Sequence, residues 1–167
     1  MKMIDVGAKN KTERVAIARG FVTMAPETVG IVERGESEKG DVLAAARLAG
    51  ILAAKKTPEI VPLCHPIALS AIDVEATTRE GGVEIVATVR TVDRTGVEME
   101  ALAAVCAGLL TVYDMLKRYE RGMRIEAVEL IEKRGGRTGT WRRPSSPPAP
   151  PKGSRAPRAR SSRTRAG

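Results

Sequence analysis

Apolar and polar residues alternate along two consecutive stretches in the middle of the chain. In residues 72–78 the positions Ile72, Val74 and Ala76 are apolar, and the residues between them are polar. A second alternating stretch covers residues 83–91, and Glu80-Gly81-Gly82 lies between the two. A period of two interrupted by a glycine turn predicts a β-hairpin that buries one face.

Two other segments have the residue spacing of helices. From Gly40-Asp41 to Lys56 an alanine-rich apolar pattern predicts a first helix, which the prolines that follow cannot continue. Residues 97–121 predict a second helix that ends at Gly122. Short apolar segments at 21–24 and 124–133 predict one strand before the first helix and one after the second.

The resulting order is strand, helix, strand, strand, helix, strand. This order is typical of an α+β, ferredoxin-like (βαββαβ) fold, in which an antiparallel sheet carries both helices on one face.

The C-terminal part of the chain has a different composition from the rest. The 167 residues include 28 Lys+Arg, 20 Asp+Glu and one His, and eight of the basic residues but no acid fall in 142–167. Residues 1–141 are therefore formally neutral and predict one folded domain. Residues 142–167 form a basic Pro/Ser/Arg-rich tail, predicted to be disordered from residue 144 because it has too few apolar residues to bury.

Composition excludes several classes of protein. Aromatic residues make up only 2% of the chain, too few for a platform that stacks nucleic-acid bases. Two Cys and one His argue against a disulfide framework and a zinc cluster. No apolar run approaches the ~18–20 residues of a membrane span, and the first residues lack the apolar core of a signal peptide. We therefore expect a cytoplasmic protein with no membrane partner and no structural metal, and nucleic-acid binding only non-specifically through the tail.

Several reactive side chains stand where the predicted fold does not need them. His65 lies in a loop between prolines. A lone loop histidine is most often simply exposed, but the prolines fix its backbone and add the interpretation of a placed acid, base or ligand contact. Asp114 and Lys117 share a face of the second helix as an ordinary ion pair or as reactive groups. Because apolar residues surround Asp114 in the sequence, we expect its carboxyl to be partly buried.

Glu98 and Glu100 stand where the second helix begins, a position that acids often occupy because they favour the helix dipole. Glu100 and Asp114 are separated by about 21 Å along one helix, so one small substrate could hardly touch both in one subunit. Either they serve separate purposes, or, more economically if both are functional, a site is shared between subunits.

Cations and glycines suggest anion contacts elsewhere in the chain. Lys39 precedes the first helix, and Lys133 precedes Gly135-Gly136-Arg137-Thr138-Gly139, a loop able to hold phosphate oxygens but without the Walker spacing. Lys9 and Arg14 add two cations near the N-terminus.

Taken together, these segments resemble the cyclic pyranopterin monophosphate synthase family, the C protein of molybdenum cofactor biosynthesis. The resemblance runs from about Ile4 to Trp141. It rests most specifically on Pro62-Leu63-Cys64-His65-Pro66 and Thr95-Gly96-Val97-Glu98-Met99-Glu100-Ala101, and also on Lys39-Gly40-Asp41-Val42 and Leu110-Thr111-Val112-Tyr113-Asp114-Met115.

The resemblance implies a ferredoxin-like subunit assembled as a hexamer, a trimer of dimers, with active sites between subunits. It implies conversion of the small molecule 3′,8-cyclo-7,8-dihydroguanosine 5′-triphosphate to cyclic pyranopterin monophosphate, with release of pyrophosphate. No cofactor is implied, although Mg²⁺ can accompany the phosphates.

The resemblance also implies a role for each matching residue. The catalytic set is Asp114, Lys117 and Lys39. Substrate contacts around the base and ribose fall on Leu63, Cys64, His65, Glu98, Met99 and Glu100. Triphosphate contacts fall on Lys9, Arg14 and Lys133.

Two departures from the family pattern are visible. Members usually carry a short segment before the Ile4-Asp5-Val6 region, where this chain begins almost at once. The family's Gly-Gly-Lys-Ser-Gly appears as residues 135–139 with Arg137 and Thr138.

Two other classes of function stay open from the residues. One is a nucleic-acid-binding oligomer that uses the basic tail, and the other is a regulatory domain that binds a purine nucleotide without turnover.

Overall fold

The predicted hairpin forms one edge of a larger sheet. In the computed structural model, which describes residues 1–144, β2 (Ala71–Arg79) and β3 (Gly82–Asp93) pair antiparallel, with Ile72 opposite Val89 and Val74 opposite Ala87. The alternating apolar residues of both strands are buried or half-buried on the same face. The hairpin and its buried face are therefore confirmed.

The first strand lies in the centre of the sheet. β1 (Thr12–Thr23) pairs antiparallel with β3 on one side and with β4 (Arg124–Arg134) on the other, giving the order β2-β3-β1-β4-β5. The strand predicted over 21–24 is thus only the end of a strand of 12 residues. Its helix-facing positions are the small residues Ala16, Ala18 and Gly20, followed by Val22, which gives a weaker apolar signal than the hairpin does.

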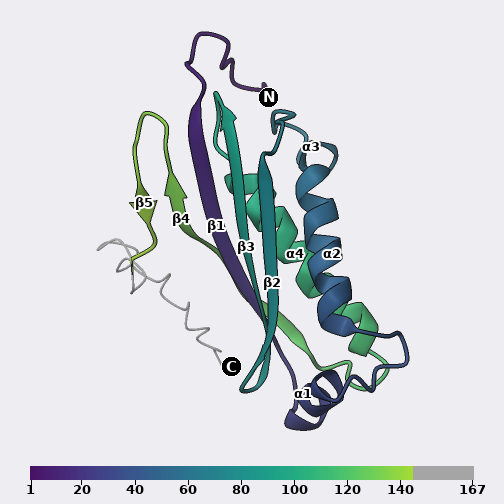
Figure 1. Cartoon of the computed structure of the whole chain (residues 1–167). Helices are drawn as coiled ribbons and strands as arrows, with labels where there is room; N and C mark the ends of the chain where they lie inside the picture. The colour runs from purple at the N-terminus through teal and green to yellow at the C-terminus, as the bar shows by residue number, and fades with distance from the viewer. Residues whose placement is uncertain (145–167) are drawn as a thin grey trace, which may run out of the picture.

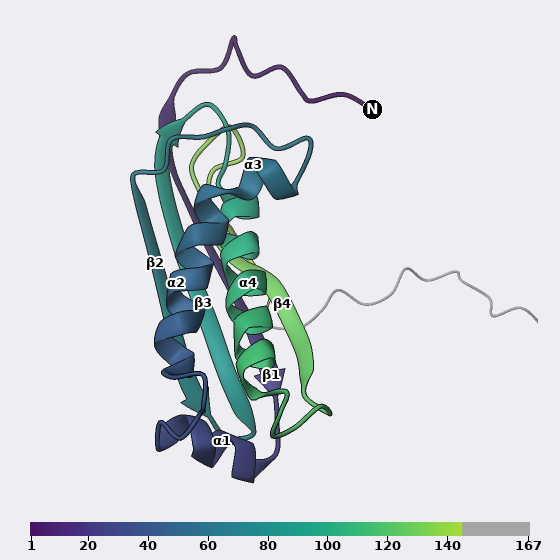
Figure 2. The ribbon, with the colours of Figure 1, turned by 90° about the vertical axis from the view of Figure 1, so that its right-hand side faces the viewer.

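The two predicted helices pack side by side on one face of the sheet (Figures 1 and 2). α2 (Val42–Lys55) begins after Asp41, whose side chain accepts a hydrogen bond from the amide of Ala44 at 2.9 Å and so caps the helix. α4 (Glu98–Leu116) crosses the middle of the sheet. A methyl group at Gly20 of β1 would lie 2.7 Å from side-chain atoms of α4, so a larger residue there would push the helix outward. The α+β, ferredoxin-like architecture is confirmed.

Several elements differ from the sequence expectation. α4 ends at Leu116 rather than near residue 121, because the chain turns there and the amides of Tyr119 and Glu120 both donate to the carbonyl of Leu116. Two short helices, α1 (Pro26–Glu33) and α3 (Thr57–Ile60), were not predicted. Both carry proline in the first turn, where the missing amide costs no hydrogen bond.

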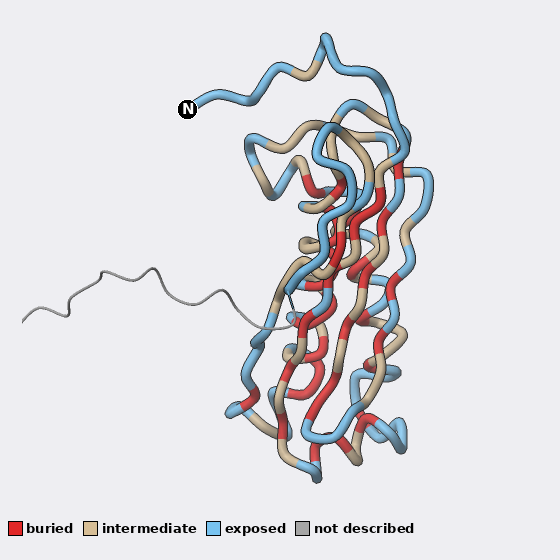
Figure 3. Tube along the Cα trace, turned by 90° about the vertical axis from the view of Figure 1, so that its left-hand side faces the viewer, coloured by how far each residue is buried: buried red, intermediate tan, exposed pale blue. Residues whose placement is uncertain are grey.

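Buried residues recur along the strands and the facing sides of the helices, whereas the segment before β1 is mostly exposed (Figure 3). Among residues 1–144, α4 is the one helix long and apolar enough to cross a membrane, contrary to the expectation that no segment would qualify. Half of that stretch is buried inside the protein, as in the core helix of a folded domain.

The sheet continues slightly beyond the predicted domain boundary at residue 141. β5 (Trp141–Arg142) pairs with β4, and the amide of Arg143 donates to the carbonyl of Ile131 at 2.8 Å. Apart from these first residues, the tail predicted to be disordered lies outside the described residues.

Candidate active site

The residues predicted for the site divide between the two ends of α4. The N-terminal segment, the loop after α3 and the first turn of α4 lie at one end of the molecule, whereas α1 and the last turn of α4 lie at the other (Figures 1 and 2). Glu98 to Glu100 form the first turn of α4, and Asp114 lies in its last turn. Asp114 is 14 positions after Glu100, which corresponds to about 21 Å of helix, as expected from the sequence.

A basic cavity of about 600 Å³ opens at the first of these ends. Its cations come from separate parts of the chain, so only the fold brings them together. They are Lys9 before β1, Arg14 on β1, Arg94 after β3, Lys133 on β4, and Arg137 in the loop after β4. Five cations beside the single acid Glu98 make a cavity suited to a polyanion such as a triphosphate.

Hydrogen bonds hold the walls of this basic cavity together. Arg14 donates from Nη2 to the carbonyl of Arg94 at 3.4 Å, and Arg94 donates from Nε to the carbonyl of Lys9 at 3.1 Å. Lys133 donates from Nζ to the hydroxyl of Thr138, which links β4 to the glycine loop. The buried Nε of Arg14 has no hydrogen-bond partner among residues 1–144.

Arg94 is a site residue that the sequence analysis missed. It lines the basic cavity and also orients the N-terminal segment through Lys9. The sequence signal for Arg94 is its position directly before Thr95-Gly96, in the short connection between a strand and a helix. Backbone amides at the start of a helix can bind an anion.

The predicted base and ribose contacts gather next to α4. Cys64 donates from Sγ to Oε1 of Glu100 at 3.4 Å, and His65 contacts the carbonyl of Ile4 through Nε2 at 2.8 Å. Leu63 and Met99 are 49% and 40% exposed, which leaves both side chains available to a ligand. Glu98 lines the basic cavity, and Glu100 lies on the same turn of α4. The predicted base and ribose contacts therefore adjoin the basic cavity.

Burial changes the acidity of the pair formed by Cys64 and Glu100. Glu100 is only 2% exposed, and this desolvation raises the pKa of its carboxyl above the ordinary value of 4.5. Desolvation, followed by the nearby charge of Glu100, raises the pKa of the Cys64 thiol to about 11. The thiol is therefore a poor nucleophile at neutral pH, and the pair is suited to hydrogen bonding.

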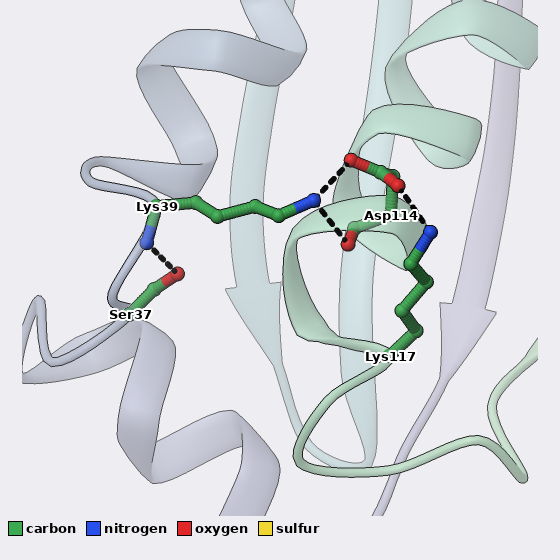
Figure 4. A network of polar contacts seen from close by, with 4 residues as sticks. All are labelled: Ser37, Lys39, Asp114 and Lys117. Carbon is green, nitrogen blue, oxygen red and sulfur yellow. Dashed lines mark hydrogen bonds and ion pairs between the residues drawn. The ribbon is translucent and has the colours of Figure 1, made fainter.

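At the other end of α4, one carboxylate lies between two ammonium groups (Figure 4). Lys39 Nζ is 2.6 Å from Oδ2 of Asp114 and also donates to the Asp114 carbonyl at 3.1 Å. Lys117 Nζ is 2.7 Å from Oδ1 of Asp114. Because the last carbonyls of a helix lack partners within it, Lys39 also stabilises the end of α4.

The expectation that Asp114 is partly buried is wrong. Its side chain is 54% exposed, because residues such as Val112 and Met115 turn toward the sheet and Asp114 points to the opposite side of α4. Hydrogen bonds from Lys117 and then Lys39 lower the pKa of Asp114 to about 2. The carboxyl is thus ionised at neutral pH.

Among residues 1–144 no group of three or more His, Cys, Asp or Glu side chains is placed to hold a metal ion.

The chain belongs to the MoaC family, whose sequence profile matches residues 3–136. Its relatives are enzymes. A protein of Thermomicrobium roseum named cyclic pyranopterin monophosphate synthase is 58% identical over 144 residues, which cover 85% of this chain and 87% of the relative. A protein of Novosphingobium aromaticivorans with the same name is 54% identical over 141 residues, covering 84% and 90%. The resemblance seen in the sequence is confirmed.

Proposed function

We propose that the protein catalyses the reaction for which these relatives are named, the formation of cyclic pyranopterin monophosphate for molybdenum cofactor biosynthesis. The substrate is 3′,8-cyclo-7,8-dihydroguanosine 5′-triphosphate, and pyrophosphate is released. Beside the family relationship, the observation that carries the proposal is the basic cavity, which collects five cations from three stretches of the chain, 9–14, 94 and 133–137, beside Glu98.

The basic cavity suits the phosphate part of this reaction. A ribose hydroxyl attacks the innermost phosphorus, a new P–O bond forms, and the bond to the outer two phosphates breaks. The electron pair of that bond leaves on pyrophosphate. Lys9, Arg14 and Lys133, with Arg94 and Arg137, would neutralise the charge that develops on the leaving group.

The group formed by Lys39, Asp114 and Lys117 suits the rearrangement of the base, which requires water to open the imidazole ring and several protons to move. Asp114 is a carboxylate at neutral pH and holds both lysines by direct ion pairs. We propose that Asp114 orients the two amines and that they donate and accept the protons.

A substrate of this size does not span the length of α4, so we propose that the site forms between subunits. One subunit would contribute the basic cavity and its partner the Lys39–Asp114–Lys117 group, within a hexamer built as a trimer of dimers. Exposed leucines on the outer side of the helices, Leu48 and Leu52 of α2 and Leu110 of α4, support association.

We further propose that the enzyme works in the cytoplasm. That it needs no resident metal stays a prediction, with Mg²⁺ arriving on the substrate phosphates; turnover after removal of divalent ions with a chelator tests it.

The test of the reaction is pyrophosphate release by the purified full chain from enzymatically generated substrate, with chromatography of the oxidised pterin product. We expect turnover by the wild type and a loss of about 100-fold or more in Asp114→Asn and Lys117→Ala, since the first change misplaces the proton-transferring amines, the second removes one, and a positioned proton-transfer group contributes about that much. Asp73→Asn, on the exposed edge strand β2, is the matched control and should retain activity.

The outcomes separate this function from the other two classes. Substrate binding without product would indicate the regulatory domain, and retention on nucleic acid at physiological salt without turnover would indicate the nucleic-acid-binding oligomer. Either result would contradict the proposal.

A further inference from the structure

Lys39 lies on a loop between α1 and α2, yet its ammonium group reaches a carboxylate 75 residues away in the sequence. The contact of Lys117 with Asp114 is set by the helix itself, because both residues lie within one turn at the end of α4. We call residues 36–39 the lysine loop. The position of this loop decides whether the long Lys39 side chain meets Asp114 or extends into solvent.

One hydroxyl group links the lysine loop to the end of α4. Tyr119 Oη accepts a hydrogen bond from the amide of Glu38 at 3.0 Å and lies 3.4 Å from the carbonyl of Glu36, to which it donates. A phenol hydroxyl can accept and donate at the same time, so both bonds form together. They involve the backbone on either side of Ser37 and so fix the path of the loop directly before Lys39.

The second link is an ion pair. Arg118 Nη1 is 2.6 Å from Oε2 of Glu38, and the two side chains are 74% and 59% exposed. Exposed pairs of this kind contribute little and are screened by salt, so the hydroxyl of Tyr119 is the stronger of the two links.

The lysine loop also has internal order of its own. The amide of Lys39 donates to the hydroxyl of Ser37 at 3.4 Å (Figure 4), and the amide of Gly40 donates to the carbonyl of Ser37 at 2.9 Å. These local bonds shape the turn but do not tie it to α4. The tie to the helix end comes from Tyr119 and Arg118.

We propose that Tyr119 is a positioning residue for turnover: its hydroxyl holds the lysine loop so that Lys39 stays on Asp114. The effect on turnover rests on the proposed function, whereas the effect on the contact between Lys39 and Asp114 does not.

The contact can be measured without substrate. A water-soluble carbodiimide couples an amine to a carboxylate when the two touch, and mass spectrometry counts the products. The Lys117–Asp114 product is an internal reference, because α4 sets that distance. In Tyr119→Phe we expect the Lys39–Asp114 product to fall about 2–10-fold relative to this reference, the change that matches loss of hydrogen bonds of ordinary net strength.

The kinetic arm uses pyrophosphate release by the same full-length variants. We expect Tyr119→Phe to lower kcat about 2–10-fold and to leave KM within about twofold, because the basic cavity that binds the phosphates lies at the other end of α4. A residue needed only for stability would leave both kcat and KM unchanged in a protein assayed well below its melting temperature.

Tyr113→Phe is the matched control. It removes a phenol hydroxyl from the same end of α4, but that hydroxyl donates to the carbonyl of Arg121 and not to the lysine loop. Its ratio of products and its kcat should equal those of the wild type, and an equal decrease in both variants would overturn the proposal.

The remaining outcomes are also decisive. An unchanged product ratio in Tyr119→Phe overturns the proposal, and so does a lowered ratio with unchanged kcat. If the wild type shows no turnover, the proposed function fails, while the product ratio still decides whether Tyr119 places Lys39.

Discussion

At the scale of single residues, Glu100 differs most from an ordinary acid at a helix N-terminus. Its carboxyl is 2% exposed; Oε1 accepts from the Cys64 thiol and Oε2 has no partner within the described protein. A carboxylate in this position loses the hydration that it would have in the unfolded chain. The protonated form is therefore favoured by folding.

This state predicts a pH-dependent loss of stability. The pKa of Glu100 is raised by burial in the folded chain above its ordinary value of 4.5. Below pH 4.5 both states hold the proton and nothing is lost, but as pH rises from 4.5 the unfolded chain ionises first and stability declines. We expect Glu100→Gln to melt at a higher temperature than the wild type at pH 8 and at nearly the same temperature at pH 4.

Thermal unfolding followed by circular dichroism at the two pH values measures this difference. A melting-temperature difference of the same size at pH 4 and pH 8 would contradict the assignment, because it would come from packing and not from ionisation.

The sequence identified most of the candidate site residues, but it did not predict how far each side chain is buried or what it contacts. Four cations of the basic cavity were named without the structure, but Arg94 was not. The exposure of Asp114 could not be predicted either, because apolar sequence neighbours on a helix point to other faces than the residue itself. The burial of Glu100 against Cys64 likewise depends on a contact 36 residues apart.

At the scale of elements, the glycine loop after β4 brings two chain segments unusually close. Gly135 has a φ of 90°, and a methyl group there would lie 2.0 Å from the carbonyl oxygen of Glu13 on β1. Gly139, at the other end of the same loop, also has a positive φ of 61°, but open space surrounds it.

These two glycines form a matched pair for mutation. Either change to alanine should cost about 1–2 kcal/mol of stability for the left-handed backbone. Gly135→Ala must also displace the loop or β1, and with them Arg137 and Arg14, so KM should rise about tenfold or more. Gly139→Ala should keep KM within about twofold.

Steady-state kinetics of pyrophosphate release and thermal melting of both variants test the comparison. If both variants raise KM equally, loop strain alone controls binding and the close contact with β1 is irrelevant.

Elements with a regular period were predicted, and those that depend on tertiary context were not. The hairpin and α2 follow from period and capping within their own segments. The full length of β1 was missed because its buried positions are small residues that face α4. β5 has only two residues and exists because β4 offers it a partner.

At the scale of the whole molecule, the basic cavity and the Lys39–Asp114–Lys117 group lie at opposite ends of α4, which predicts complementation between subunits. Lys133→Ala alters the basic cavity and Asp114→Asn alters the other group. Each variant alone should lack activity, because each of its sites carries one altered part. If subunits share sites, a mixed dimer contains one site with both changes and one with neither. Random mixing should therefore restore about a quarter of the wild-type activity.

Co-expression of the two variants with different tags, followed by assay of the purified mixed oligomer, measures this recovery. Lys117→Ala mixed with Asp114→Asn is the control, because both changes fall in one group and no mixed dimer regains an unaltered site. Activity of a stable monomer, established by light scattering, would rule out the shared site.

The position of α4 also limits how this protein can change over evolution. Each residue of a helix adds about 1.5 Å and about 100° of rotation. A single insertion or deletion between Glu100 and Asp114 would therefore turn one end group away from its neighbours while leaving the other in place. We expect natural relatives to vary the residue types of this interval freely on its outer side, but to keep the number of residues in it constant and to accept length changes only in the loops.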